Sequence, residues 1–586
     1  MTPLVRRLAL ALGAALVVGG GVAGGTWLVL RRPPKETRVV EVVTEGGGLG
    51  AVELERSVTI PLEMALNGAP GVAAIESETT ARRSVVRARL APKADLVTVR
   101  QEILQRLQTA VLPAETASPV LGPSGSGMTL TYALVPEPTT TLATLRTLQD
   151  WEVARALLTI PGVVDVSACG GRAERVEVLL DAARLRALGV GPGDVASALS
   201  AAAASGVGAN AGGSAFAVRV AGAFSRVEDV GAVLVATRNG APVRVADLAV
   251  VRFGAASPDC IARREGREEL VLAEVMLRRD ADTTAVAAAV SARLRELTGR
   301  WPARVEPLEM EARARWLHAR VSLTEESALA GIVAAAHASP GVADVFTRRR
   351  DDAPDVELFA RLSPAASPDE AATAMARAFE KLPGARYDLT SLARPLARDV
   401  RVARVRIRGS GDLATLGEIG AKIVTALGDV PGVSNASVPD ARQLPHVAIV
   451  PDRTALARLG VSAPDVEVAV QLALAGRAVG TLHQGERRLD VVLRLASTDA
   501  APAVPGALAD VDVVGASGTY VPLHALAQVK LAEEPARILR DGGERVIDVL
   551  FDAKDARALD AARAKLLATV QLPAGVSLTL SRAGDE

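Results

Sequence analysis

The chain has 586 residues, which is too long for one domain and suggests about three to five. It is 49% hydrophobic and 23% charged, so it can form packed cores, and its 67 basic and 67 acidic residues cancel. A neutral chain with 2% aromatic residues is unlike a generic nucleic-acid-binding protein, and two cysteines exclude a disulfide-rich scaffold or a cysteine-rich zinc site.

The N-terminal segment is long and apolar enough to cross a membrane. Residues 8–30 are uncharged over 23 positions, and a helix rising about 1.5 Å per residue would carry them across a bilayer core of roughly 30 Å. We predict a retained anchor; a cleaved signal peptide is the alternative, with small residues near Ala23. The segment contains no ionisable residue and therefore offers no proton relay.

An internal repeat organises the rest of the chain. The tripeptide Pro-Gly-Val begins at Pro70, Pro161, Pro340 and Pro431, and the members of each successive pair are 91 positions apart. This spacing indicates an ancestral duplication of a two-unit block. A helical pattern precedes each copy and a β-type run follows it, so the Pro-Gly is expected to end a helix and turn the chain into a strand.

Each repeated unit has mixed helix and strand periodicity. The spacing of apolar residues predicts helices near 95–109 and 555–570, and residues 84–90 predict a strand with Arg87 and Arg89 on its polar face. The fold class is therefore α+β, built from repeated split β-α-β, ferredoxin-like units. Loop- and hairpin-rich inserts occupy 182–265 and 453–540, with a hairpin turn at Asn239-Gly240.

No complete catalytic or cofactor-binding motif is present in the sequence. The segment 122–127 lacks the Gly-x-Ser-x-Gly spacing of a nucleophile elbow, and 206–211 fits the dinucleotide fingerprint only in a variant form. Cys169 and Cys260 are expected to be buried structural thiols, and the scattered methionines to fill cores. We predict that the protein is not an enzyme and binds no cofactor.

Several segments, in order along the chain, resemble the resistance–nodulation–division (RND) efflux transporters. SVTIPLEMALNGAPGV at 57–72 resembles the first periplasmic motif of that family. Similarity to its heavy-metal efflux branch is carried by four segments: LRTLQDW at 145–151, VATRNGAPVRVAD at 235–247, AGRAVG at 475–480 and GERRLDVV at 485–492. The likeness extends from about residue 38 to 580.

The resemblance implies four pore subdomains and two docking subdomains after the N-terminal anchor at 1–36. In the first half these are a first pore subdomain at 37–125, a second at 126–181 and 266–308, and a docking subdomain at 182–265. A linker at 309–322 follows. The second half has a third pore subdomain at 323–396, a fourth at 397–452 and 541–580, and docking at 453–540.

The sequence departs from the family at the place of its membrane helices. Full members carry twelve, including the proton-relay carboxylates, whereas a short charged segment at 309–322 joins the two halves here. The resemblance implies a single-pass protein of the bacterial inner membrane with its bulk in the periplasm. The arginines that flank residues 8–30 would favour the opposite orientation by a simple positive-inside count.

We expect a permease subunit of an RND heavy-metal efflux system, reduced to its anchored porter and docking region and lacking the proton relay. The alternative is a transport-inactive periplasmic binding or scaffold protein associated with a complete efflux complex. By resemblance, the partners are copies of the chain in a homotrimer, a periplasmic adaptor and an outer-membrane channel, or a full-length permease. No nucleic acid is expected.

The cleft between the third and fourth pore subdomains is where family members take up substrate. The corresponding segments contain four candidate metal ligands: His337, Asp344, Asp429 and Asp440. Imidazole and carboxylate suit zinc, cobalt or nickel better than monovalent copper. The alternative is that these are solvated loop residues. No residue is expected to inherit the proton-relay role.

Overall fold

The computed structural model describes residues 38–46, 49–113, 116–122, 125–203, 209–210, 217–218, 223–258, 260–278, 281–298, 303–307, 316–323, 328–350, 355–379, 381–382, 385–391, 394–395, 401–409, 412–438, 443–474, 476–496, 505–515 and 518–582. None of the helices within these ranges has both the length and the apolar character needed to cross a bilayer. The expected anchor at 8–30 lies outside them.

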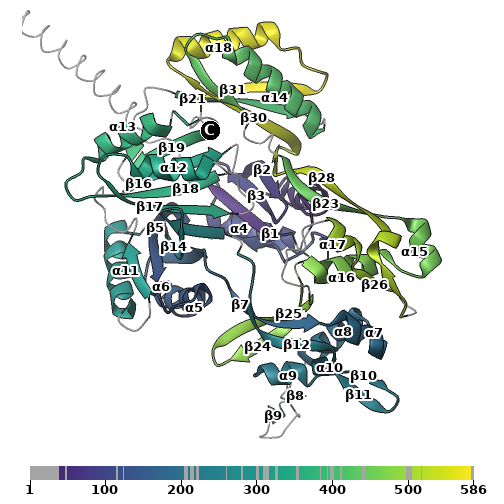
Figure 1. Ribbon diagram of the computed structural model, residues 1–586. Helices are drawn as coiled ribbons and strands as arrows, with labels where there is room; N and C mark the ends of the chain where they lie inside the picture. Colours follow the sequence, from purple (N-terminus) through teal and green to yellow (C-terminus); the bar gives the residue numbers. More distant parts are fainter. Residues whose placement is uncertain are drawn as a thin grey trace, which may run out of the picture.

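Two large sheets form the centre of the described molecule (Figure 1). The first has nine strands: β1 (Val39–Glu45), β2 (Val72–Thr80), β3 (Arg83–Leu90), β4 (Val120–Leu121), β21 (Arg401–Gly409), β22 (Val433–Ser437), β29 (Arg537–Asp541), β30 (Glu544–Ala553) and β31 (Val576–Arg582). The second has ten: β5 (Gly125–Pro136), β6 (Val163–Cys169), β13 (Cys260–Arg264), β14 (Glu268–Arg278), β15 (Ala303–Pro307), β16 (Trp316–Leu323), β17 (Val342–Arg350), β18 (Asp355–Leu362), β19 (Ala385–Ser391) and β20 (Arg394–Pro395).

Each sheet joins two helix-on-sheet units, one from each half of the chain. The antiparallel pairing of β2 with β29 joins the first unit to the fourth, from Glu76↔Asp541 to Thr80↔Arg537. The pairing of β13 with β17 joins the second unit to the third, from Cys260↔Arg350 to Arg264↔Phe346. The duplicated halves therefore interlock, because each sheet takes one unit from each half.

Helical segments cover one face of each unit, and the apolar core lies between helix and sheet. The pairs, in chain order, are α2–η1–α3 (Ala51–Leu54, Glu55–Thr59, Ile60–Leu66) with α4 (Leu96–Leu107), α5–η2–α6 (Leu142–Leu148, Gln149–Val153, Ala154–Leu158) with α11 (Thr283–Thr298), α12 (Ala328–His337) with α13 (Pro368–Phe379), and α14 (Leu413–Gly428) with α18 (Ala556–Thr569). The mixed α+β class and the helices predicted near 95–109 and 555–570 are confirmed.

The repeated Pro-Gly-Val tripeptide has one structural role in all four units. The glycines of the four copies have positive φ and each directly precedes a strand: 84° at Gly71, 97° at Gly162, 80° at Gly341 and 83° at Gly432. Only glycine adopts this left-handed conformation without a steric cost. The tripeptide therefore turns the chain from helix to strand, as predicted.

Two inserts extend from the large sheets. The first contains β7 (Glu174–Leu180), α7 (Ala182–Leu188), α8 (Pro192–Ala203), β8 (Ala209–Asn210), β9 (Ala217–Val218), α9 (Val227–Gly231), β10 (Leu234–Arg238), β11 (Ala241–Arg244), α10 (Val245–Leu248) and β12 (Ala249–Ala255). The second contains β23 (Gln443–Pro451), α15 (Arg453–Leu459), α16 (Ala463–Leu474), β24 (Arg477–Gln484), β25 (Arg487–Leu495), α17 (Pro505–Ala509), β26 (Asp512–Val514), β27 (Tyr520–Pro522), η4 (Leu523–Ala525) and β28 (Ala527–Pro535). The predicted hairpin turn at Asn239-Gly240 joins β10 to β11.

A hairpin of the second insert joins the sheet of the first insert. β24 and β25 complete a four-stranded sheet of order β12-β7-β25-β24, in which β25 runs parallel to β7 from Val491↔Val176 to Leu495↔Leu180. The lower part of Figure 1 shows the blue and teal strands β7 and β12 beside the yellow-green strands β24 and β25. The pairing buries apolar residues of both inserts in one core.

Five strands lie outside the segments to which the sequence assigned them. β7 and β23 were expected in the second and fourth pore subdomains, at 126–181 and 397–452, but both belong to the sheets of the inserts. β13 and β29 were expected within the inserts at 182–265 and 453–540, but both belong to the large sheets. Residues 316–322 of the expected linker form most of β16, which pairs with β18 and β19. Local periodicity indicates a strand but not the sheet it joins, so these boundaries shifted.

Candidate functional site

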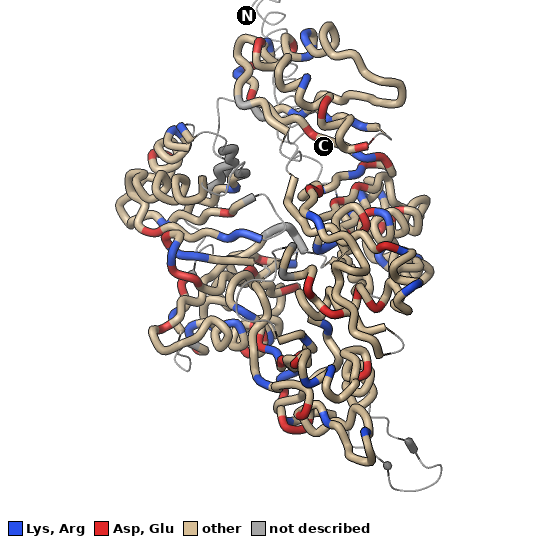
Figure 2. The backbone as a smooth tube through the Cα atoms, turned by 45° about the vertical axis from the view of Figure 1, so that its right-hand side comes forward, with Lys and Arg blue, Asp and Glu red and all other residues tan. Residues whose placement is uncertain are grey.

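The helix-free face of the ten-stranded sheet carries arginine–carboxylate pairs where the second and third units meet. On β18, Val356, Leu358 and Ala360 pack into the helix-covered core. The alternating residues Glu357 and Arg361 must therefore face the opposite side. We call this meeting of the second and third units the seam. Figure 2 shows that charged residues of both signs are spread over the described chain, so the seam is one part of a general pattern of mixed charge.

Asp344 of β17 is held between two arginines in this face. Its Oδ1 accepts a hydrogen bond from Arg264 Nη2 at 2.5 Å, and Oδ2 accepts from Arg361. Its exposed fraction is 8%. Arg264 also lies 3.6 Å from Glu306, joining β13 to β15. The carboxylate predicted as a metal ligand is thus neutralised by guanidinium groups from two units.

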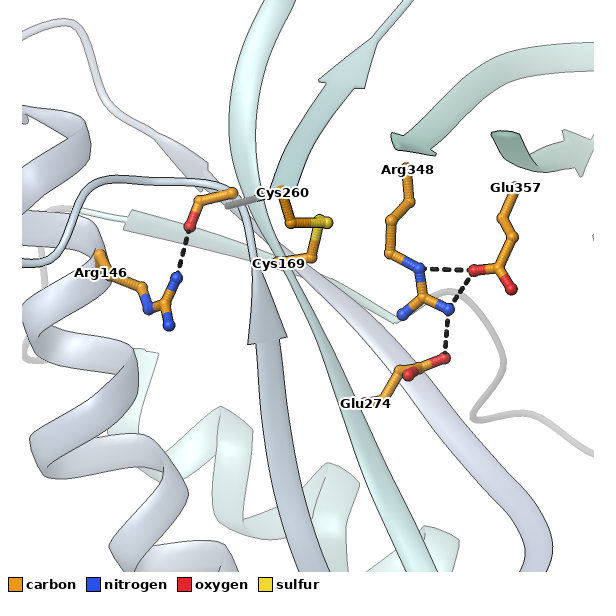
Figure 3. Close-up of a disulfide and its surroundings, with 7 residues drawn as sticks. Arg146, Cys169, Cys260, Glu274, Arg348 and Glu357 are labelled. Atoms are coloured by element: carbon orange, nitrogen blue, oxygen red, sulfur yellow. Dashed lines mark hydrogen bonds and ion pairs between the residues drawn. A yellow bond between two sulfur atoms is a disulfide. The ribbon is translucent and has the colours of Figure 1, made fainter. Parts of the chain in front are cut away.

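Arg348 lies four residues beyond Asp344 on β17 and forms a second charged cluster (Figure 3). It donates to Glu274 Oε1 of β14 at 2.7 Å and, through Nε, to Glu357 Oε2 of β18 at 2.5 Å. Burial by itself would lower the pKa of Arg348, but the two carboxylates outweigh it and raise that pKa. Burial opposes ionisation of Glu357, yet Arg348 holds the pKa of Glu357 below its usual value.

Aromatic rings and a disulfide fill the space beside these charges. Trp316 and Phe346 have ring centroids 5.8 Å apart, and His318 stacks on Phe359 at 4.7 Å. Burial lowers the pKa of His318. Trp316, Phe346 and Phe359 are buried in one cluster with Cys169. The seam is therefore a packed junction whose charged side chains are paired with one another.

Cys169 and Cys260 form a disulfide, which corrects the expectation of two buried free thiols. Cys169 ends β6 and Cys260 begins β13, and their Cα atoms are 5.1 Å apart. The two cysteines are 91 positions apart and the first insert lies between them, so no local sequence pattern indicated the pairing. Figure 3 shows the bridge close to the Arg348 cluster.

The four predicted metal ligands do not form one cluster among the residues that the structure describes. His337, at the end of α12, has Nδ1 3.1 Å from Oε2 of Glu265, and Glu265 Oε1 accepts from the Val345 amide at 2.7 Å. Asp429 follows α14 and lies 4.0 Å from Lys565 Nζ. Asp440 lies outside the described residues.

Within that described part, no group of three or more His, Cys, Asp or Glu side chains is arranged to hold a metal ion. Glu265, which the sequence reasoning missed, is the carboxylate that His337 contacts. The alternation of arginine and acidic residues on β17 and β18 signals cross-strand ion pairs. It does not identify the partner strands, so Arg264 and Arg348 were also missed.

A second buried ionic cluster joins the first unit to the fourth. Arg540 of β29 donates to Glu55 Oε1 at 2.9 Å and to Glu63 Oε2 at 3.0 Å, and Arg545 donates to Glu55 Oε1 at 2.9 Å. Ser77 donates to Glu63 at 2.5 Å. Glu55 begins the π-helical turn η1, which places its carboxylate toward the β29–β30 hairpin. Both sheet junctions are thus fixed by buried charges as well as strand pairing.

Comparison with known proteins gives a consistent result over nearly the whole chain. The AcrB/AcrD/AcrF family profile matches residues 2–337 and 354–585. The cation efflux system protein CusA of Escherichia coli (strain K12) is 31% identical over 300 residues, which is 48% of this chain and 28% of CusA. The cobalt-zinc-cadmium resistance protein CzcA of Cupriavidus metallidurans is 27% identical over 335 residues, 54% of this chain and 31% of CzcA.

A solved structure agrees in fold. The X-ray crystal structure of a heavy metal efflux pump, crystal form I, superimposes with a TM-score of 0.80 at 18% identity, covering 97% of this chain and 83% of that one. The matched region spans less than a third of the length of CusA and of CzcA.

The described fold has four helix-on-sheet units, with an insert in the second and another in the fourth, and it matches the fold of the solved heavy metal efflux pump. The chain belongs to the AcrB/AcrD/AcrF family of RND transporters, and its relatives include heavy-metal efflux proteins. Proteins of this family reside in the inner membrane and work as trimers with an adaptor and an outer-membrane channel.

Proposed function

We propose that this chain supplies the porter and docking region of a heavy-metal efflux assembly without a membrane-embedded proton relay between its halves. The observation that carries the proposal is the short connection between β15 and β16. β15 ends at Pro307 and β16 begins at Trp316, so the eight residues 308–315 connect them. At about 1.5 Å per residue, a helix of that length would cover roughly 12 Å, against about 30 Å for a bilayer core.

The proposed location is the periplasmic side of the inner membrane, with residues 8–30 as a single-pass anchor. Membership of an inner-membrane family supports this location. The Cys169–Cys260 disulfide supports it independently, because disulfides persist in oxidising compartments such as the bacterial periplasm and are rare in the cytosol.

The proposed oligomer is a homotrimer that engages an adaptor and an outer-membrane channel, or a complete permease. β23 pairs only with β28 among the described residues, whereas its repeat counterpart β7 is also paired by β25. An open strand edge of this kind can accept a strand from another chain. By family resemblance, the Gly- and Ala-rich loop 205–214 would be an arm that reaches a neighbouring copy; most of this loop lies outside the described residues.

The carboxylates at the seam favour a second candidate function, that of a scaffold that holds a complex together without carrying cargo. Asp344, Glu274 and Glu357 are each paired with arginine, so none is free to bind a cation. In neither function do these residues form a catalytic constellation, and we propose no enzymatic activity.

Reconstitution separates the two functions. The full chain in proteoliposomes, alone, should show no zinc movement in response to an imposed pH gradient, and proton-driven flux in this preparation would refute the proposal. The same vesicles with a twelve-helix permease, adaptor and channel form the second arm. Faster zinc efflux than without this chain would support the porter function, whereas co-purification with no change in flux would favour the scaffold.

A further inference from the structure

The strands β7 and β12, here called the first stalk, connect the first insert to the ten-stranded sheet, which they meet at the foot of the stalk, and β25 pairs with the other edge of β7 from Val176 to Leu180. β7 and β12 pair from Leu180↔Ala249 to Glu174↔Ala255. Below that ladder, the Ala256 amide donates to the Ala173 carbonyl at 2.9 Å, and the Gly170 amide donates to the Cys260 carbonyl at 3.1 Å. The disulfide Cys169–Cys260 lies at this last rung, so it connects the strand that enters the insert to the strand that leaves it.

Both ends of the disulfide are fixed in the sheet beneath the stalk. Cys169 pairs with Leu272 of β14, and Cys260 pairs with Arg350 of β17. The bridge therefore ties the stalk to the second unit and also to the strand that bonds the third unit. Motion of the insert about its foot would have to move these paired strands.

The chain turns sharply at Gly170, at the foot of the stalk, where there is no room for a side chain. Gly170 has φ of +88°, and a Cβ at this position would stand 2.1 Å from the Leu270 carbonyl oxygen. Arg146 Nη1 donates to the Gly170 carbonyl at 3.1 Å, which attaches the turn to α5 (Figure 3). Without the disulfide, these hydrogen bonds and the local packing would hold the stalk.

The stalk of the second insert has no such bridge. Its strands β23 and β28 pair over Gln443↔Pro535 to Pro451↔Ala527, and the whole sequence contains only the two cysteines of the first stalk. One molecule thus contains a cross-linked stalk and an uncross-linked counterpart related by the internal repeat. The two stalks differ in covalent structure and also in strand pairing, because β25 pairs with β7 whereas β23 pairs only with β28 among the described residues.

We propose that the Cys169–Cys260 disulfide is a redox-sensitive clamp that fixes the first insert to the second and third units, whereas the second stalk is held by noncovalent contacts alone, including the hydrogen bond from Val52 N to Glu534 Oε1 at 2.7 Å. When the bridge is reduced, the foot of the first stalk is likewise held without a covalent cross-link and opens more readily. The inference concerns the insert's attachment and holds for either proposed function.

The chemistry of opening is thiol–disulfide exchange. Cys260 is partly exposed and Cys169 is buried, so a reductant reaches the Cys260 sulfur first. A thiolate of a dithiol attacks Cys260 Sγ, the S–S bond breaks, and Cys169 leaves as a thiolate that takes up a proton. The second thiol of the reductant then closes its own disulfide and releases Cys260, so two electrons and two protons pass to the cysteines. Closure returns them to a disulfide donor of the oxidising compartment.

Hydrogen exchange of the full chain in detergent, with and without dithiothreitol, tests the clamp. Reduction should speed amide exchange at least about tenfold in peptides covering 163–181 and 249–264, because opening there no longer works against a cross-link. The matched peptides 443–451 and 527–535 of the second stalk should not change. Unchanged exchange in the first stalk, or equal acceleration in both stalks, would overturn the proposal.

A cysteine-free variant controls for other effects of the reductant. Cys169→Ala with Cys260→Ala should reproduce the fast exchange of the reduced first stalk without dithiothreitol and should not respond to it. Exchange as slow as in the oxidised wild type would refute the clamp. If the variant fails to fold, reduction of the already folded wild type still decides the question.

Discussion

Arg540 and Glu55 are 485 positions apart in the chain and form a buried ion pair, with Nη1 2.9 Å from Oε1. Their side chains are 10% and 1% exposed. The pair lies where the first and fourth units share a sheet, so it links the beginning of the described chain to its end. A contact of this kind determines which units can be neighbours.

Removing Arg540 should destabilise this junction strongly. Arg540→Met leaves Glu55 with one arginine and Glu63 with none, and breaking a buried ion pair from one side costs about 3–5 kcal/mol. The local opening free energy of β2 and β29, measured by hydrogen exchange, would report the loss. Arg155→Met is the matched control, because its pair with Glu486 is 55% and 80% exposed and should contribute less than about 1 kcal/mol. Equal effects would contradict a structural role for the buried pair.

Gly170→Ala should be far more damaging than Gly189→Ala. Both glycines have positive φ, so both substitutions incur the left-handed backbone cost of about 1–2 kcal/mol. Nothing lies within 4 Å of a Cβ at Gly189, whereas at Gly170 the Leu270 carbonyl oxygen is 2.1 Å away. Thermal unfolding and mass-spectrometric counting of the disulfide would show a larger fall in midpoint, and less bridged protein, for Gly170→Ala. Similar midpoints for the two variants would show that this close approach is absent.

Acid should weaken the seam between the second and third units through Glu357. Because Arg348 lowers the pKa of folded Glu357, that carboxylate stabilises the fold above its unfolded pKa, which is about 4.3. The contribution is lost as pH falls through the lower, folded value. Glu357→Gln should therefore lower the thermal midpoint at pH 7, and the gap to wild type should narrow below about pH 4. A gap that stays constant down to pH 2 would disprove this linkage.

Asp344 and His337 should respond differently to zinc. Asp344→Asn removes the partner of two arginines, so we expect a loss of about 3 kcal/mol in stability and an unchanged zinc titration. The His337 side chain is 53% exposed beside Glu265, so His337→Ala should change stability by less than about 0.5 kcal/mol and reduce any zinc heat. Isothermal titration of both full-length variants would decide. Loss of zinc heat in a folded Asp344→Asn variant would restore Asp344 as a ligand.

Local patterns in the sequence determined the repeated units. Apolar spacing located α4 and α18, and the alternation on β3 separated buried Val86 and Ala88 from Arg87 and Arg89. The four Pro-Gly-Val copies marked the turns from helix to strand, because a positive φ at glycine is a local property of the backbone. These features depend on residues within about one helical turn or one strand, so a single sequence carries them.

Only the tertiary structure decided which units share a sheet and which side chains meet. The sequence made no prediction of sheet partners, and the structure pairs β2 with β29 and β13 with β17. The Cys169–Cys260 bridge, the Arg540 pairs and the pairing of β25 with β7 likewise join segments far apart in sequence. Strand periodicity specifies which face of a strand is buried and leaves its partner open, and that choice is made by the packing of whole units.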